Sequence, residues 1–112
     1  MSKILHIIEK DKWNKDAIEY EGDTLKTEGF IHCSTPEQVI EVANYMFKGK
    51  PDLQLLVIDE DKVHAKIKYE DAGNGKLYPH IYGALNRDAV ILILDFSKDK
   101  EGSFVLPNGV YD

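Results

Sequence analysis

The sequence predicts an α+β domain built mainly from antiparallel strands. Three observations predict it: strand and helix patterns alternate in the first half, strand patterns dominate the second half, and 112 residues suit one domain. Hydrophobic residues make up 43% of the chain, enough for a packed core. We therefore expect one domain over residues 1–112, with a loose tail over 107–112.

Two short elements are predicted at the start of the chain. Residues 3–8 form an apolar run typical of a buried strand, and His6 lies within this run. Asp11 is placed to cap a short helix that contains Trp13 and closes near Gly22. An imidazole inside an apolar strand needs hydrogen-bond partners, so His6 is the first residue of interest.

Residues 29–34 predict a second strand with an unusually polar face. In a regular strand, Ile31 and Cys33 point to one side, whereas His32 and Ser34 point to the other. We interpret Cys33 as a small core residue. It is the only cysteine, so no disulfide can form within the chain.

A helix is predicted to begin directly after this strand. Thr35 suits the N-cap, Pro36 suits the first helical position, and Gln38 completes a capping box. Gly49 and Pro51 end the helix. Its buried stripe is predicted to comprise Val39, Val42, Ala43, Met46 and Phe47.

The second half predicts mainly strands. Residues 53–58 are almost all apolar and indicate a central strand, whereas 65–70 alternate and indicate an edge strand. Residues 71–86 are rich in glycine and proline and predict a long functional loop. A buried strand over 90–96 and a short strand over 104–106 follow. The outward face of the edge strand carries Lys66, Lys68 and Glu70.

Composition argues against several classes of partner. The chain has 14 Lys and Arg against 20 Asp and Glu, a formal net charge of −6, which opposes general binding to DNA or RNA. The longest apolar runs are far shorter than the roughly 20 residues of a membrane span. The amino terminus leads straight into a strand pattern without a signal-peptide pattern, so we expect a cytoplasmic protein.

Three histidines are the candidate catalytic residues. His6, His32 and His80 come from two strands and a loop, and an unsatisfied buried polar group costs about 1–3 kcal/mol, so a shared pocket would satisfy them mutually. Such a pocket suits ribose hydroxyls or phosphate, and Tyr78 and Tyr82 are placed to stack on a planar ring. We therefore expect a small, nucleotide-like ligand. The ligand-binding candidates are Ser34, Gln38, Tyr78, Tyr82 and Glu70.

Most of these residues also have a purely structural interpretation. His6 can be a satisfied core histidine, and Ser34 can help to cap the following helix. Gln38 can serve the capping box alone, and Glu70 can be a solvent-facing partner of a neighbouring lysine. His64 lies in a charged turn and is expected at the surface.

Two alternative functions remain open from the residues alone. The same pocket can belong to a non-catalytic module that binds a metabolite or a peptide. It can also hold a divalent metal ion on three imidazoles, with Glu28 or Glu70 as an added ligand, although the spacing matches no known metal motif.

The chain also resembles a known family. The resemblance is carried by His6, Trp13 and Gln38, by the segment Glu-Gly-Phe-Ile-His-Cys-Ser over 28–34, and by Pro-His-Ile-Tyr-Gly over 79–83. These residues are similar to the recurring signals of the family known only as domain of unknown function 952. The family name supplies no established reaction.

This resemblance extends over about residues 3–106 and implies an ADP-ribosyltransferase-like fold. In that fold two small sheets, with two to three helices, surround a cleft that holds NAD in the active relatives. The resemblance implies that His6 and Ser34 contact a ribose and that a late glutamate, for which Glu70 is the candidate, takes part in transfer. It thus implies a transferase with NAD as a substrate.

Overall fold

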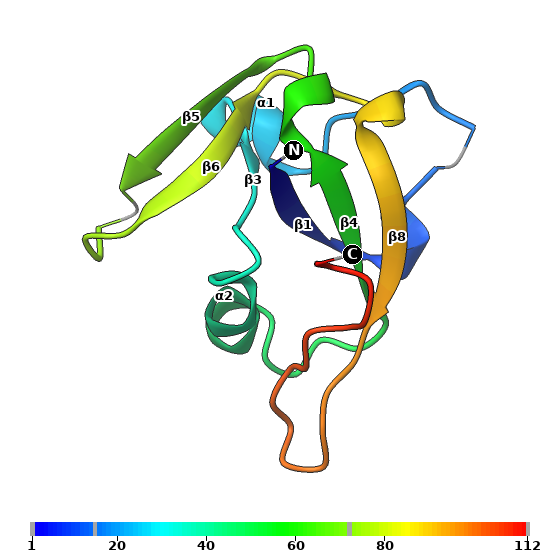
Figure 1. Ribbon diagram of the computed structural model, residues 1–112, viewed down its shortest axis with the longest axis vertical. Coiled ribbons are helices and arrows are strands. Elements are labelled where there is room, and N and C mark those ends of the chain that lie inside the picture. The colour runs from blue at the N-terminus through cyan, green and yellow to red at the C-terminus, as the bar shows by residue number, and fades with distance from the viewer. Residues whose placement is uncertain (1, 15, 72, 112) are drawn as a thin grey trace.

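The predicted fold class is confirmed at the level of α+β (Figure 1). The computed structural model describes residues 2–14, 16–71 and 73–111, in which the paired strands are antiparallel. Its strands are β1 (Lys3–Glu9), β2 (Glu19–Tyr20), β3 (Ile31–His32), β4 (Leu53–Asp59), β5 (Lys66–Asp71), β6 (Leu77–Tyr82), β7 (Leu85–Asn86) and β8 (Val90–Phe96). Its α-helices are α1 (Thr24–Glu28) and α2 (Val39–Met46). Short 3-10 turns cover Lys10–Lys12, Glu60–Lys62 and Arg87–Ala89.

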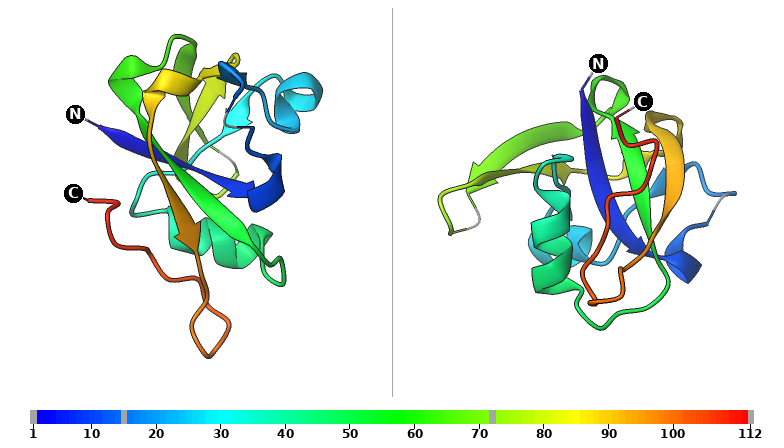
Figure 2. Two further views of the ribbon diagram at one scale, coloured as in Figure 1. Left: turned by 90° about the vertical axis from the view of Figure 1, so that its right-hand side faces the viewer. Right: turned by 60° about the horizontal axis from the view of Figure 1, so that its bottom comes forward.

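Two three-stranded sheets and a two-stranded ribbon make up the β structure. The strand orders are β1-β4-β8 and β3-β6-β5, and β2 pairs with β7. The two larger sheets meet where Leu5 of β1 lies beside Ser34: the Leu5 N–H donates to the Ser34 carbonyl at 2.7 Å, and the Ser34 N–H donates back to the Leu5 carbonyl at 2.8 Å. The chain that leaves β3 therefore crosses directly onto β1 (Figure 2).

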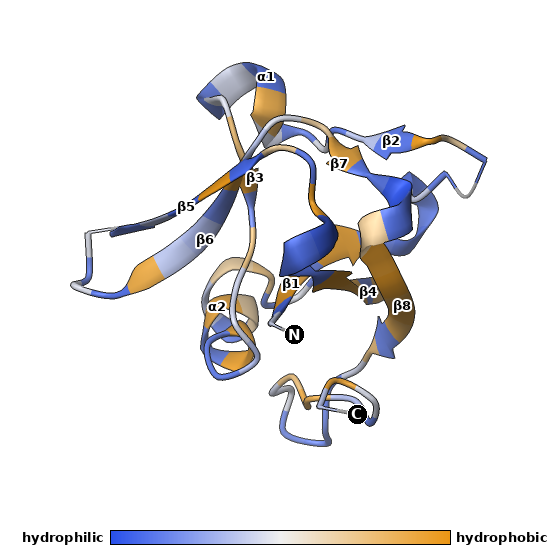
Figure 3. Ribbon diagram, turned by 45° about the horizontal axis from the view of Figure 1, so that its top comes forward, coloured by the Kyte–Doolittle hydropathy of each residue, from blue (hydrophilic) through white to orange (hydrophobic). Residues whose placement is uncertain are grey.

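Hydrophobic residues cover both faces of the β1-β4-β8 sheet. On one face, Leu5, Leu55 and Val57 pack with Val39 and Ala43 of α2. On the other face, the core lies against the β3-β6-β5 sheet and comprises Ile4, Ile8, Ile31, Cys33, Leu56, Ile58, Ile81, Leu85 and Ala89. The hydrophobic residues of β4 stand out in Figure 3. The prediction of a central strand covered on both faces is thus confirmed for β4.

The prediction of a long loop over 71–86 is wrong, because this segment contains the strands β6 and β7. Pro79 lies within β6, the central strand of its sheet, where proline is normally excluded. Continuing the β3–β6 register places Pro79 opposite Cys33, whose N–H donates to the Pro79 carbonyl at 3.0 Å. Because proline has no N–H to return, the ladder ends there and the chain turns toward β1.

The predicted strand over 29–34 is shorter than expected, because a helix occupies the residues before it. The helix α1 was not predicted; it ends at Gly29, whose left-handed φ of 89° and N–H bond to the Leu25 carbonyl form its C-cap. Only Ile31 and His32 then pair with β6. Upstream, the expected helix from Asp11 is a single 3-10 turn over Lys10–Lys12, and Lys15 lies outside the described residues.

A helix follows β3 as predicted, but α2 begins at Val39, three residues after the expected first position Pro36, and its buried stripe is confirmed in part. Gln38 Oε1 accepts from the Thr35 N–H at 3.1 Å, which is the capping contact that the spacing predicts. Val39 and Ala43 are buried, but Met46 is 62% exposed. Among the described residues, no helix is long and apolar enough to span a bilayer.

Three expectations about the last part of the chain are wrong. The strand β8 lies at a sheet edge, where Leu92 and Ile93 are exposed instead of buried. The expected strand over 104–106 is an isolated bridge between Lys98 and Phe104. The expected loose tail carries Val110, which is 1% exposed and belongs to the core beside α2.

The tight approach of Gly83 to the β5 region yields a stability prediction. A Cβ at position 83 would lie 2.8 Å from the Ala65 Cβ, closer than two carbons can approach. We expect Gly83→Ala to lower the free energy of unfolding by about 1–3 kcal/mol in chemical denaturation. Adding Ala65→Gly should restore part of the loss; no recovery in the double variant would contradict this steric explanation.

Candidate functional site

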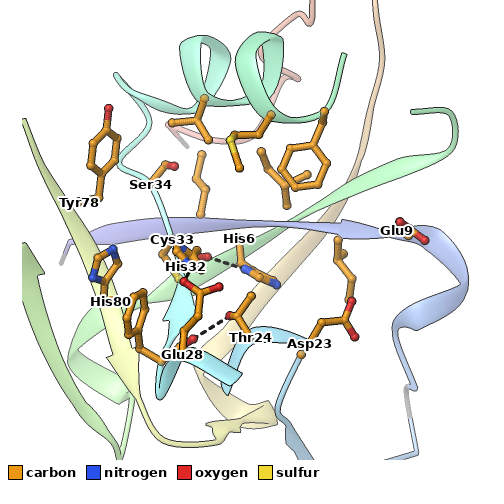
Figure 4. A pocket seen from close by; sticks show the side chains of 18 of the residues that line it. His6, Glu9, Asp23, Thr24, Glu28, His32, Cys33, Ser34, Tyr78 and His80 are labelled. Atoms are coloured by element: carbon orange, nitrogen blue, oxygen red, sulfur yellow. Dashed lines mark hydrogen bonds and ion pairs between the residues drawn. The ribbon is translucent and has the colours of Figure 1, made fainter. Parts of the chain in front are cut away.

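A groove of about 1440 Å³ runs between the helix α2 and the segment that carries β2 and α1 (Figure 4). Residues 5–9 of β1 line its floor. Tyr78 and His80 of β6 line it together with His32 of β3. The described part of the chain therefore contains a concave site to which all three predicted histidines contribute, because His6 also lines it.

His80 forms a carboxylate–imidazole pair. Its Nδ1 donates to Glu70 Oε1 at 2.9 Å, and the Tyr82 hydroxyl donates to the same oxygen at 2.5 Å. The hydrogen bond from Tyr82, followed by that from His80, lowers the pKa of Glu70 below its ordinary value. The Glu70 carboxylate accepts from Nδ1 and so favours the imidazole tautomer of His80 that has its lone pair on Nε2.

Phe30 supports this imidazole from one side. The Phe30 and His80 rings stack with centroids 4.1 Å apart and planes 19° apart. The His80 side chain is 8% exposed, whereas Glu70 is more than a third exposed. The packing against Phe30 and the bond to Glu70 together define the orientation of His80.

His32 forms a second pair of the same kind. Its Nε2 lies 3.1 Å from Glu28 Oε1, four residues earlier in the chain. The β3–β6 register places His32 beside His80, and their ring centroids are 5.3 Å apart. Gly29 makes this pair possible, because its left-handed turn brings the end of α1 alongside β3.

His6 contributes to the groove wall, but both its ring nitrogens are occupied. Nδ1 lies 2.6 Å from the His32 carbonyl, which can only accept, so Nδ1 carries the proton. Nε2 therefore accepts from the Tyr20 hydroxyl at 2.9 Å. Burial lowers the pKa of His6 to about 4 and raises that of Tyr20 to about 12. The structural interpretation of His6 thus has strong geometric support.

The remaining candidates divide into two groups. Ser34 and Tyr78 line the groove, and the Tyr78 hydroxyl accepts from Asn74 Nδ2 at 3.0 Å. Gln38, Glu70 and Tyr82 are not among its lining residues. Gln38 instead joins the start of α2 to β6, because its Nε2 donates to the Leu77 carbonyl at 2.7 Å while its Oε1 accepts from the Thr35 N–H.

Three structural interpretations can be compared with the geometry directly. Glu70 does not simply face solvent beside a lysine, because it accepts from His80 and Tyr82. Cys33 is buried, and burial raises the pKa of its thiol, which keeps it protonated and makes it a poor nucleophile. His64 is exposed, as its charged turn predicts.

The metal alternative finds no support in the described part of the chain. There, no three His, Cys, Asp or Glu side chains are grouped closely enough to hold a metal ion. His6 also lacks a free ring nitrogen, because both nitrogens have partners. The two imidazole–carboxylate pairs have the donors and acceptors that hydrogen bonding and proton transfer require.

Two residues of the site, Phe30 and Tyr20, were not predicted to act in it, and Glu28 was considered only as an added metal ligand. Phe30 stacks on His80, Glu28 pairs with His32, and Tyr20 donates to His6. The spacing of Glu28 four residues before His32 predicts their contact only when Gly29 is recognised as the end of a helix. Tyr20 has no comparable signal, because it reaches His6 through the pairing of β2 with β7.

Comparisons with known proteins give a family and a fold. The family model described as "Protein of unknown function (DUF952)" matches residues 7–93. The crystal structure of protein CC0527 from Caulobacter crescentus is similar, with a TM-score of 0.87 and 28% identity over 99% of this chain and 100% of that one. Its solution NMR structure has a TM-score of 0.79 and 30% identity over 92% and 91%. None of the curated proteins matches this chain.

Proposed function

The chain belongs to the DUF952 family of proteins of unknown function, and we propose that its groove binds a nucleotide-like small molecule on which His80 transfers a proton. One observation carries the proposal: the His80–Glu70 and His32–Glu28 pairs lie side by side at the groove, with imidazole centroids 5.3 Å apart. A carboxylate that holds one ring nitrogen leaves the other to act as a base.

The ADP-ribosyltransferase-like fold that the family resemblance implies suggests the reaction. In transfer of a ribosyl group from NAD, the bond between ribose C1′ and the pyridinium nitrogen breaks, and both electrons leave with the nicotinamide. Carboxylates on the groove walls stabilise the positive charge that develops on the sugar. His80 Nε2 accepts the proton that a water or hydroxyl acceptor loses as its oxygen bonds to C1′.

Charge restricts which part of a nucleotide can enter deeply. The groove is lined by more carboxylates than lysines, so that its walls can accept hydrogen bonds from ribose hydroxyls but repel phosphates. The proposed mode therefore places the base and ribose inside and the phosphates toward solvent. Tyr78 and Phe30 offer aromatic surfaces for the base.

Titration calorimetry tests the proposal with NAD, ADP-ribose and nicotinamide riboside. We expect the riboside, which has no diphosphate, to bind at least as tightly as ADP-ribose, because the walls repel phosphates. We also expect the affinity for ADP-ribose to rise with salt, which screens that repulsion. Absence of binding to the wild-type protein by all three ligands at millimolar concentration would refute the proposal.

Turnover distinguishes an enzyme from a binding module. Chromatography of the NAD mixture should reveal free nicotinamide, and its release should depend on His80. The matched control is His64→Ala, which removes an exposed histidine that does not line the groove. Tight binding without nicotinamide release would reject the transferase and retain only a ligand-binding role.

A further inference from the structure

The groove extends well beyond the histidines along the helix α2. Its volume of about 1440 Å³ exceeds the roughly 300–1,000 Å³ typical of a site for one small molecule. The two imidazole–carboxylate pairs involve residues of α1, β3, β5 and β6, whereas α2 lines a different stretch with Val42, Tyr45, Met46 and Phe47. This stretch, bounded by α2 on one side and by 19–23 on the other, is called the α2 channel below.

The α2 channel presents large apolar side chains to solvent. Tyr45 is 84% exposed and Met46 is 62% exposed, although Val39 and Ala43 of the same helix are fully buried. The helix therefore has a second apolar face that the fold does not use. Exposed apolar groups gathered on one wall of a groove are typical of an interaction surface.

The rim of the α2 channel is acidic. Its carboxylates include Glu9, Glu19, Glu21, Asp23 and Glu41, of which Glu41 is paired with Lys76 at 2.8 Å. The two lysines among the lining residues, Lys12 and Lys50, already lie 3.9 Å from Asp23 and 3.2 Å from Glu9. Within the described ranges, no ion pair joins Glu19 or Glu21 to another side chain.

We propose that the α2 channel docks a segment of a partner protein in which apolar side chains are interspersed with lysine or arginine. The apolar residues cover Tyr45 and Met46, and the cations lie against Glu19 and Glu21. Charge complementarity selects this occupant, because an acidic segment or a phosphate-rich surface would be repelled by the rim. The proposal does not depend on binding of a small molecule at His80.

Fluorescence anisotropy tests it with a labelled peptide in which lysine alternates with leucine. We expect saturable binding that weakens as salt is added. Replacing the lysines by glutamate, or the leucines by serine, should abolish it. Equal binding of the glutamate peptide, or no binding of the lysine peptide, would overturn the proposal.

Paired variants locate the binding surface. The double variant Glu19→Lys with Glu21→Lys should weaken the lysine peptide by about tenfold, which corresponds to about 1.4 kcal/mol. Met46→Ser should weaken it as well. The controls are Leu92→Ser on β8 and Glu101→Lys, which alter an exposed apolar group and a charge outside the groove. Weakening by the controls equal to that by the channel variants would contradict the assignment.

Two further measurements separate this proposal from its competitors. His80→Ala should leave peptide binding unchanged, so the fate of the small-molecule proposal does not decide this one. Analytical ultracentrifugation should give the same sedimentation behaviour for the wild-type protein and for Met46→Ser. A dimer broken by Met46→Ser would mean that a second copy of this chain occupies the channel, and would overturn the partner proposal.

Discussion

Replacing His80 with alanine should weaken binding of nicotinamide riboside by at least about tenfold, a loss of about 1.4 kcal/mol or more. The variant removes the imidazole, whose Nε2 has no hydrogen-bond partner among the described residues, and it leaves Glu70 with Tyr82 alone. It should also stop nicotinamide release from NAD. Calorimetry and chromatography of the purified variant measure the two effects.

A second variant separates this effect from damage to the fold. His80 stacks on Phe30, so the alanine variant also loses packing. Glu70→Gln keeps the shape of the side chain but removes the charge that holds the His80 proton on Nδ1. We expect it to reduce turnover and shift its pH profile, with little change in the unfolding midpoint. Turnover that falls only in proportion to stability in both variants would mark the pair as structural.

Acidification should destabilise the protein through His6. Burial lowers the pKa of His6 to about 4 in the folded chain, from an ordinary value of 6.5. The unfolded chain therefore binds this proton first, and the stabilisation is complete above pH 6.5 and lost as the pH falls toward 4. The loss amounts to about 3 kcal/mol. Urea denaturation at a series of pH values measures it.

The variant His6→Gln isolates this contribution. Its amide can still donate to the His32 carbonyl and accept from Tyr20, but it does not titrate in this range. The free energy of unfolding of this variant should therefore fall less between pH 6.5 and 4 than that of the wild-type protein. His64→Gln, at an exposed site, serves as the control. Identical pH dependence in wild-type and His6→Gln proteins would show that His6 is not the titrating group.

Local patterns predicted the elements that local forces determine. The continuous apolar run of β4 predicted its central position, and the Thr35–Gln38 spacing predicted a capping contact that is present at 3.1 Å. The residues of β4 are buried on both faces of the sheet, and Thr35 lies only three residues from Gln38. Sequence reasoning succeeds there because one interaction dominates.

Tertiary pairing explains the elements that the sequence did not predict. Pro79 argued against a strand, yet β6 tolerates it because the neighbouring chain leaves toward β1 at that point. Val110 lies in a segment without a pattern, and its burial depends on a distant core that no local signal reveals. Propensity cannot anticipate a contact between residues that are far apart in the chain.

The candidate site was predicted only in part, because local patterns identify its residues but not their partners. Alternation in 29–34 identified His32 and Ser34 as one polar face, and both line the groove. The partners of the histidines were harder to foresee, because Glu70 reaches His80 across the β5–β6 hairpin and Tyr20 reaches His6 from a separate ribbon. The residue types indicated a polar site, whereas its pairing required the fold.

The reciprocal backbone contact between Leu5 and Ser34 has a consequence for how the protein opens. Both amide hydrogen bonds lie where the two sheets meet, so the sheets cannot separate without breaking these bonds. Local unfolding of a single hairpin leaves these two hydrogen bonds in place. In deuterated water, these two amides should therefore be among the last to exchange, at a rate that follows complete unfolding.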